Sequence, residues 1–175
     1  ASLLQGLLGF YDRLAEQDPS DTDVRRESAV ASRRVGDIRQ RLGQADRAET
    51  AYAWAVAKLT ALNAQHSADI ALRIELARAH NEIGSVRSAK LETGYAYQSH
   101  REALAVLRTA EPIAGSSPEY RYELARTLYF LAGQHPGAPA GGHGDGAGED
   151  AARARTHADK SQAYRQQAIG ILEQL

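Results

Sequence analysis

Arg25-Arg26-Glu27-Ser28-Ala29 recurs as Arg73-Ile74-Glu75-Leu76-Ala77 and once more as Arg121-Tyr122-Glu123-Leu124-Ala125. The two intervals are both 48 residues long, and Leu76-Ala77-Arg78 is repeated without change as Leu124-Ala125-Arg126. Self-similarity at a fixed period of roughly 20 to 50 residues is the mark of repeat architectures. We therefore expect the chain to consist of stacked copies of one structural unit.

The apolar residues within each unit recur at helical spacing. Along residues 24–42 the apolar stripe steps by four and three, and the same steps follow along 72–86 and 120–131. Such spacing places one apolar stripe along a helix face, whereas a half-buried strand would alternate with a period of two. A second amphipathic segment follows at 48–62 and again at 96–107. The pattern predicts an all-α chain whose unit is a helix–turn–helix.

Residues that favour helix ends flank these segments. Ser, Asp and Asn side chains accept hydrogen bonds from the first free N–H groups of a helix, and glycine ends helices in the left-handed conformation. The predicted starts are Ser20 or Asp21, Ser67 or Asp69, and Ser117 before Pro118, and the predicted stops are Gly43 and Gly94.

The first residues match the second helix of an earlier unit. Leu7, Tyr11 and Leu14 precede Ala55, Leu59 and Leu62 by one period. The apolar run that opens the chain is short and lacks a basic flank, so we interpret it as a helix without its packing partner, not as a signal peptide.

The last unit is interrupted by residues 133–149, which include seven glycines and two prolines. Such a composition has almost nothing to bury and is typical of a flexible linker. The repeat resumes at 166–172, which match 101–107 at one period plus 17 residues. We predict a single domain over 1–175 with a flexible surface insertion at 133–149 inside its last helical hairpin.

Charge and composition limit the partners. The 21 basic and 22 acidic residues nearly cancel, whereas proteins that bind nucleic acid usually carry a basic excess. The chain has no cysteine, which excludes disulfides and thiolate metal sites. No apolar run approaches the roughly 20 residues needed to span a bilayer. We expect neither nucleic acid nor membrane as a partner.

The units resemble the tetratricopeptide repeat, whose motif asks for Gly or Ala late in the first helix and then Ala, an aromatic residue and Ala on the second. The resemblance implies a right-handed superhelical solenoid of antiparallel helix pairs, with about three and a half repeats and a longer period than the common 34 residues. The matching residues are Val35-Gly36, Ala48, Tyr52 and Ala55 in the first unit and Ile83-Gly84, Ala96, His100 and Ala103 in the second.

A narrower resemblance rests on Phe10-Tyr11-Asp12-Arg13-Leu14-Ala15, Val35-Gly36-Asp37-Ile38 and Arg41-Leu42-Gly43. These stretches are similar to the C-terminal repeat regions of large bacterial serine/threonine protein kinases, especially those of planctomycetes. The resemblance implies a cytoplasmic interaction module or scaffold that regulates a signalling protein. The motifs of the kinase domain itself are absent, so the resemblance implies no kinase activity for this chain.

The resemblance also implies where a partner binds. In the family, the first helices line a concave surface that binds a protein or peptide segment. Three arginines on these helices suit an acidic or phosphorylated segment, because guanidinium groups pair bidentately with carboxylate and phosphate; we expect Arg78 and Arg126 to be exposed. The predicted partner-binding residues are Arg33, Asp37, Gln40, Arg78, Asn81, Ser85, Arg126 and Tyr129.

Other interpretations stay open from the sequence. The chain could be a permanent subunit that associates with itself or another protein through its N-terminal helix, or an enzyme fragment whose loop 142–147 grips phosphate or metal. His80 and His100 could form half a metal site or a buried polar pair. The repeated Arg and Glu residues could form ladders between units or could simply be solvated. No catalytic residue, cofactor or metal ligand is predicted.

Overall fold

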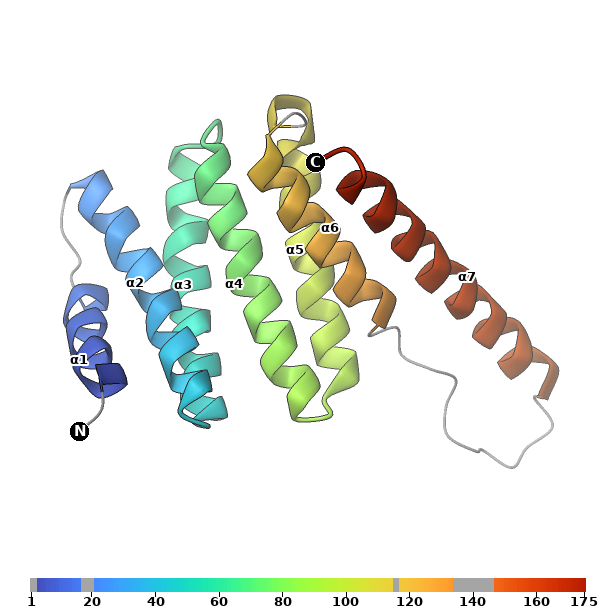
Figure 1. Ribbon diagram of the computed structural model, residues 1–175, viewed down its shortest axis with the longest axis horizontal. Helices are drawn as coiled ribbons and strands as arrows, with labels where there is room; N and C mark the ends of the chain where they lie inside the picture. Colours follow the sequence, from blue (N-terminus) through green and yellow to red (C-terminus); the bar gives the residue numbers. More distant parts are fainter. Residues whose placement is uncertain (1–2, 17–20, 115–116, 134–146) are drawn as a thin grey trace.

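A computed structural model describes residues 3–16, 21–114, 117–133 and 147–175. In these ranges the chain forms seven α-helices and no strand, which confirms the all-α prediction. Figure 1 shows the helices side by side in chain order, from α1 at one end to α7 at the other. Their bounds are Leu3–Ala15 (α1), Thr22–Arg41 (α2), Ala45–Gln65 (α3), Ile70–Ala89 (α4), Thr93–Ala114 (α5), Pro118–Gly133 (α6) and Ala147–Leu172 (α7).

Each helix packs against the next one in the chain. The hairpins α2–α3 and α4–α5 are closed by short turns, and α6 packs against α7. The first helices of the hairpins also touch one another, α2 with α4 and α4 with α6. The three units are therefore joined twice, through successive helices and through a row of first helices.

Side-chain caps begin the first helices as predicted. Asp21 accepts hydrogen bonds from the backbone N–H groups of Asp23 and Val24, and Asp69 accepts one from Leu72 at 3.1 Å. In the third unit α6 starts at Pro118, and the Ser117 hydroxyl accepts a hydrogen bond from the backbone N–H of Tyr120. Each cap satisfies a donor that would otherwise lack a partner in the first helical turn.

One of the two predicted stops is wrong. Gly43 ends the first helix in the left-handed conformation, with φ of 73°, but Gly94 lies inside α5. The second hairpin makes the same turn one period after Gly43, at Leu91, whose φ is 63°. Both turns have the same backbone hydrogen bonds. The N–H of Gly43 or Leu91 bonds the carbonyl three residues earlier, and the N–H of the following residue bonds the carbonyl five residues earlier. The turn geometry is repeated although the glycine is not.

Small residues let the paired helices approach closely. A Cβ added to Gly36 would lie 2.5 Å from Cδ1 of Tyr52, and one added to Gly84 would lie 2.5 Å from Cε1 of His100. The third unit has Ala132 at this position, and Arg165, which replaces the aromatic residue, is exposed. Glycine is therefore found where a ring packs against the first helix.

The edges of the predicted insertion differ from the structure. Gly133 is the last residue of α6, and α7 already begins at Ala147, so the range 133–149 is too long at both ends. Residues 134–146 lie outside the described ranges. Among the helices that the structure does describe, none combines the length and apolarity that crossing a bilayer requires.

Candidate functional site

Two predicted binding residues are buried. Arg33 is 6% exposed and Asn81 is not exposed at all. The Arg33 guanidinium lies 2.9 Å from Glu75 on the next first helix and 3.2 Å from Asp37 on its own helix. A side chain enclosed in this way has no face for a ligand, so the placement of Arg33 and Asn81 on an open surface is wrong.

The other two arginines are half-buried and paired. Arg78 lies 2.7 Å from Glu75, 2.9 Å from Glu119 and 3.3 Å from Glu123. Arg126 pairs with Glu82 and lies 3.2 Å from Glu123. The expectation that these guanidinium groups are exposed for a partner is therefore also wrong. Their carboxylate partners come from the chain itself.

A ladder between units exists, but Arg33 and Arg78 form it with the repeated glutamates in place of the repeated arginines. The repeated Glu75 and Glu123 both take part, and each accepts a bond from the preceding first helix. The arginines beside them in the repeat do not: Arg25 bonds Gln65, and Arg73 bonds the carbonyls of Thr109 and Ser67. Burial raises the pKa of the Glu75 carboxyl, but the guanidinium groups of Arg33 and Arg78 outweigh this effect. The pKa of Glu75 is therefore below its ordinary value.

A buried hydrogen-bond network continues the ladder into the second helices. The Asn81 amide donates to Glu123 at 2.9 Å and to Thr127 at 2.8 Å, so its oxygen accepts from His100 Nδ1 at 3.0 Å. His100 stacks on Phe130, and its Nε2 has no hydrogen-bond partner within the described ranges. Burial, with Arg126 nearby, lowers the pKa of His100 to about 4. The ring is thus neutral and protonated on Nδ1.

The remaining predicted residues have separate surroundings. Asp37 and Gln40 each lie 3.0 Å from the Tyr52 hydroxyl and hold the ring in place. Burial, followed by the charge of Asp37, raises the pKa of Tyr52. Ser85 bonds the carbonyl of Asn81, while Tyr129 is 69% exposed. Of the eight predicted residues, Gln40 and Tyr129 are exposed, and the set does not form one binding surface.

The two histidines do not face each other as a pair. His80 Nδ1 lies 3.1 Å from Glu102, whereas His100 bonds Asn81. Burial lowers the pKa of His80, and Glu102 opposes that shift. Within the described part of the chain, no three His, Asp or Glu side chains are grouped so that they could hold a metal ion.

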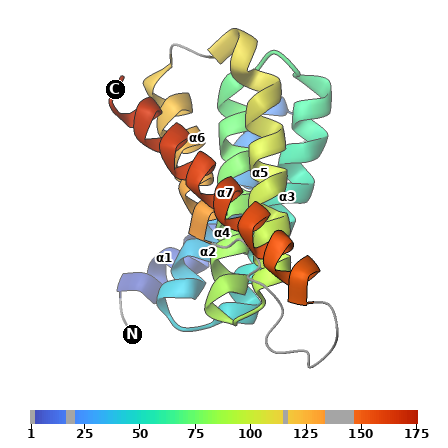
Figure 2. The ribbon, with the colours of Figure 1, turned by 90° about the vertical axis from the view of Figure 1, so that its right-hand side faces the viewer.

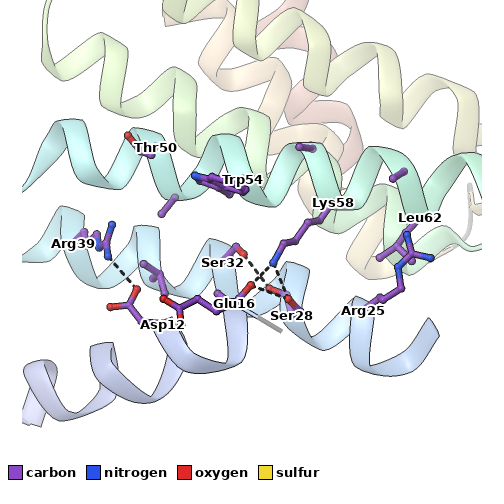
Figure 3. A pocket seen from close by; sticks show the side chains of 15 residues that line it. Asp12, Glu16, Arg25, Ser28, Ser32, Arg39, Thr50, Trp54, Lys58 and Leu62 are labelled. Carbon is purple, nitrogen blue, oxygen red and sulfur yellow. Dashed lines mark hydrogen bonds and ion pairs between the residues drawn. The ribbon is translucent and has the colours of Figure 1, made fainter. Parts of the chain in front are cut away.

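A concavity lies elsewhere, over α2 between α1 and α3. This α2 groove has a volume of about 690 Å³. Figure 3 shows α2 as its floor, with Asp12 of α1 and Glu16 just after it along one side and Thr50, Trp54 and Lys58 of α3 along the other. The walls mix alanines with polar and charged side chains, and Trp54 is 63% exposed at the rim. The lining residues are Asp12, Ala15, Glu16, Arg25, Ser28, Ser32, Val35, Arg39, Thr50, Ala51, Trp54, Ala57, Lys58, Ala61 and Leu62.

The groove is open because the first unit has small residues on its floor. Ser28 and Ser32 of α2 correspond to Leu76 and His80 one period later, and both of these side chains are largely enclosed. On the wall, Lys58 corresponds to Val106, which packs against the apolar core. Leu76 and His80 are larger than the two serines and fill in the second unit the space that stays open in the first.

Polar groups fix the two ends of the groove. Lys58 reaches across from α3 and donates to the Ala15 carbonyl and to Ser28 Oγ, which lies 2.7 Å from Nζ (Figure 3). A cation at the last carbonyls of α1 also complements the helix dipole. At the other end Arg39 lies 3.0 Å from Asp12. These contacts fix the position of α1 relative to α2 and α3 at the two ends of the groove.

The sequence contained a signal for the groove. Ser28 lies in the apolar stripe of the first unit, where the later units have leucine. Ser32 likewise takes the place of His80 and Leu128. A lost side chain in a repeat predicts a missing contact, and comparison of the units position by position could have located it.

Comparison with known proteins does not extend these observations. No family model matches the chain, and no curated protein sequence matches it.

Proposed function

We propose that this chain is a non-catalytic scaffold of the tetratricopeptide type, a right-handed solenoid that binds a protein or peptide segment in its α2 groove. The observation that carries the proposal is a cleft with Ser28 and Ser32 on its floor and an exposed Trp54 at its rim, where the next unit has the larger Leu76 and His80. Ligand sites are typically concave and mostly apolar, with a few polar groups that set orientation. The kinase resemblance supports a regulatory module of a larger cytoplasmic signalling protein.

The second unit suggests the chemistry of the ligand. Leu76 and His80 cover the α4 floor there, so a segment bound over Ser28 and Ser32 would supply a large apolar or aromatic side chain at this place. Trp54 would cover it from the rim, since tryptophan buries a large area and is common at binding hot spots. The preference for an acidic or phosphorylated partner loses its basis, because the ladder already neutralises the arginines on which it rested.

A filling substitution tests the groove. Ser32→Leu copies the residue of the third unit and occupies the floor, at the loss of one hydrogen bond from Ser32 to the carbonyl of Ser28. Ser85→Leu is the matched control, because Ser85 makes the same bond four residues back and does not line the groove. Both variants should keep the helical circular dichroism of the wild type.

The measurement uses Trp54, the single tryptophan of the chain. Peptides are selected from a random displayed library on the wild-type protein and then titrated. We expect bound peptides to shift the Trp54 emission to shorter wavelength. Their affinity for the Ser32→Leu protein should be about tenfold lower than for the wild type, whereas their affinity for the Ser85→Leu protein should be unchanged. Equal binding to both variants, or a library without binders, would contradict the proposal.

A further inference from the structure

Arg25 differs from its counterparts in the later units in what it bonds. Arg73, one period later, is 9% exposed and donates to the Thr109 carbonyl at 2.6 Å. Arg121 of the third unit donates to the Gln174 carbonyl at 3.1 Å, which is the same contact once the insertion is counted. In both later units this arginine therefore ties the first helix to a backbone carbonyl near the end of the second.

Arg25 lines the α2 groove and is half-buried there. Its guanidinium lies 3.3 Å from the side-chain oxygen of Gln65, a neutral and exposed group. Among the residues that the structure describes, Arg25 has this one hydrogen bond and no ion pair. Arg33, Arg78 and Arg126 of the first helices, by contrast, each pair with a glutamate. The groove thus contains an arginine whose charge the ladder does not neutralise.

The position of Arg25 sets where a bound anionic group would lie. Figure 3 shows Arg25 at the end of the groove beyond Lys58 and Ser28, on the side away from Trp54. Arg25 precedes Ser28 and Ser32 by three and seven residues, which corresponds to about 5 and 10 Å along α2. A carboxylate three or four residues from a side chain that covers the two serines would reach the guanidinium, in a helical or an extended segment.

A further unit at the start of the stack would not cover this groove. In the second unit the corresponding space lies over α4, between α3 and α5, and Figure 2 shows these two helices on the same side of α4. Leu76 and His80 of α4 fill that space, although the preceding unit is in place. The groove is therefore open because of Ser28 and Ser32, and not because a neighbouring helix is missing.

We propose, on the basis of the function proposed above, that the α2 groove selects a segment of a partner protein with an acidic side chain three or four residues from its large apolar residue. The apolar residue covers Ser28 and Ser32, and the carboxylate pairs with Arg25. A guanidinium group suits this role because it forms two parallel hydrogen bonds with one carboxylate. Glu16, which is exposed on the α1 side of the groove, disfavours a phosphate group, whose charge is about −2.

Selection from a displayed library tests the charge preference. The library presents random peptides between constant flanks, so that it offers no free carboxyl terminus. Peptides that bind the wild type should have Asp or Glu at a fixed spacing from a large apolar residue. Peptides selected on Arg25→Glu should have Lys or Arg at that spacing, because the reversed charge repels a carboxylate.

The contact with Arg25 is then measured with one selected peptide, acetylated and amidated, and with a variant in which its acidic residue is replaced by the corresponding amide. Titrated by Trp54 emission against the wild type, the amide variant should bind about five- to tenfold more weakly. The acidic peptide should lose the same factor on Arg25→Gln, whereas the amide variant should bind both proteins equally. Added salt should weaken the binding of the acidic peptide to the wild type, because it screens exposed charges.

Arg41→Gln is the matched control, because it removes the same charge from an exposed position of α2 outside the groove and should leave binding unchanged. Circular dichroism should show that Arg25→Gln keeps its helices. Binders without an acidic residue, or equal binding by Arg25→Gln and Arg41→Gln, would overturn this inference and leave the groove itself in place. Binders that Ser32→Leu does not weaken, or an absence of binders, would contradict the proposed function and this inference with it.

Discussion

The ring of Tyr52 packs against the backbone of Gly36 so closely that no side chain fits between them. A Cβ on residue 36 would lie 2.5 Å from Cδ1 of the ring and 2.8 Å from Cζ. The hydroxyl at the far end of the ring is held by Asp37 and Gln40, both on α2. The ring therefore has little freedom to move away, and the packing of α2 on α3 depends on a glycine at this position.

Gly36→Ala should lower the free energy of unfolding by about 1–3 kcal/mol, the usual cost of adding a methyl group to a well-packed core. Urea denaturation followed by circular dichroism measures it. Gly170→Ala is the matched control, because a Cβ there meets nothing within 4 Å and alanine favours the helix. A Gly36→Ala protein as stable as the control would show that the ring has room to shift.

Leu91→Gly should stabilise the chain by about 1 kcal/mol. Leu91 holds a left-handed conformation that costs a non-glycine residue about 1–2 kcal/mol, and its side chain is almost fully exposed, so its loss removes no packing. Gly43→Ala, at the same turn of the preceding hairpin, should change the stability in the opposite direction. Thermal melts of both variants give the comparison, and a destabilised Leu91→Gly would contradict it.

Arg78→Ala should destabilise the chain by about 2–4 kcal/mol, because it leaves the carboxylate of the buried Glu123 with fewer partners. Arg34→Ala is the matched control: Arg34 also pairs with an acidic residue three positions away, but it is exposed, and such pairs contribute about 0–1 kcal/mol. Chemical denaturation near pH 7 compares the two variants. Similar small losses in both would mean that the ladder is solvated.

His100 should make the stability fall as the pH decreases below about 6.5. Its pKa in the folded chain is about 4, below the ordinary value of 6.5, so between these values the unfolded chain binds a proton that the folded chain does not. Protonation then favours unfolding, and the free energy of unfolding should drop by about 2 kcal/mol between pH 7 and pH 5 from this group alone. His80, whose pKa is also lowered, acts in the same direction.

His100→Tyr provides the control for this pH dependence. Tyrosine is the residue at the equivalent position 52 of the first hairpin, so a ring still packs against Gly84 while the titrating imidazole is lost. Denaturation series at pH 5, 6 and 7 for both proteins show the difference. If the two proteins lose the same stability between pH 7 and pH 5, the imidazole of His100 is not its source.

The sequence was sufficient for the helices because their signals are local. The steps of three and four and the caps at Asp21 and Asp69 each involve residues a few positions apart. The prediction that a helix ends at Gly94 was wrong because the repeat preserves the turn geometry and not the glycine. Leu91 adopts the left-handed conformation because the hairpin around it requires that turn.

The site was harder to predict because it depends on contacts between units. Arg33 and Asn81 occupy the same position of the repeat, and both donate to a glutamate 42 residues further along the chain. From the sequence alone, Arg33 is expected to be an unpaired cation on the surface of a helix. Only the position of the next first helix shows that its charge is already neutralised, and only the loss of side chains at Ser28 and Ser32 reveals the groove.

The sharing of Glu123 between two first helices also bears on how the chain comes apart. This carboxylate accepts hydrogen bonds from Arg78 and Asn81 of α4 and from Arg126 of α6. Local opening of either helix would therefore leave charged groups of the other helix without their partners. Stretches linked in this way open as one cooperative unit, and their amides exchange with solvent at a common rate. The one carboxylate of α1 in the described ion pairs, Asp12, is partly exposed and bonds Arg39 alone, and the Ala15 carbonyl at the end of α1 accepts from Lys58 and Ser28. Hydrogen exchange should therefore begin at α1, at the very wall of the groove, while α4 and α6 remain protected together.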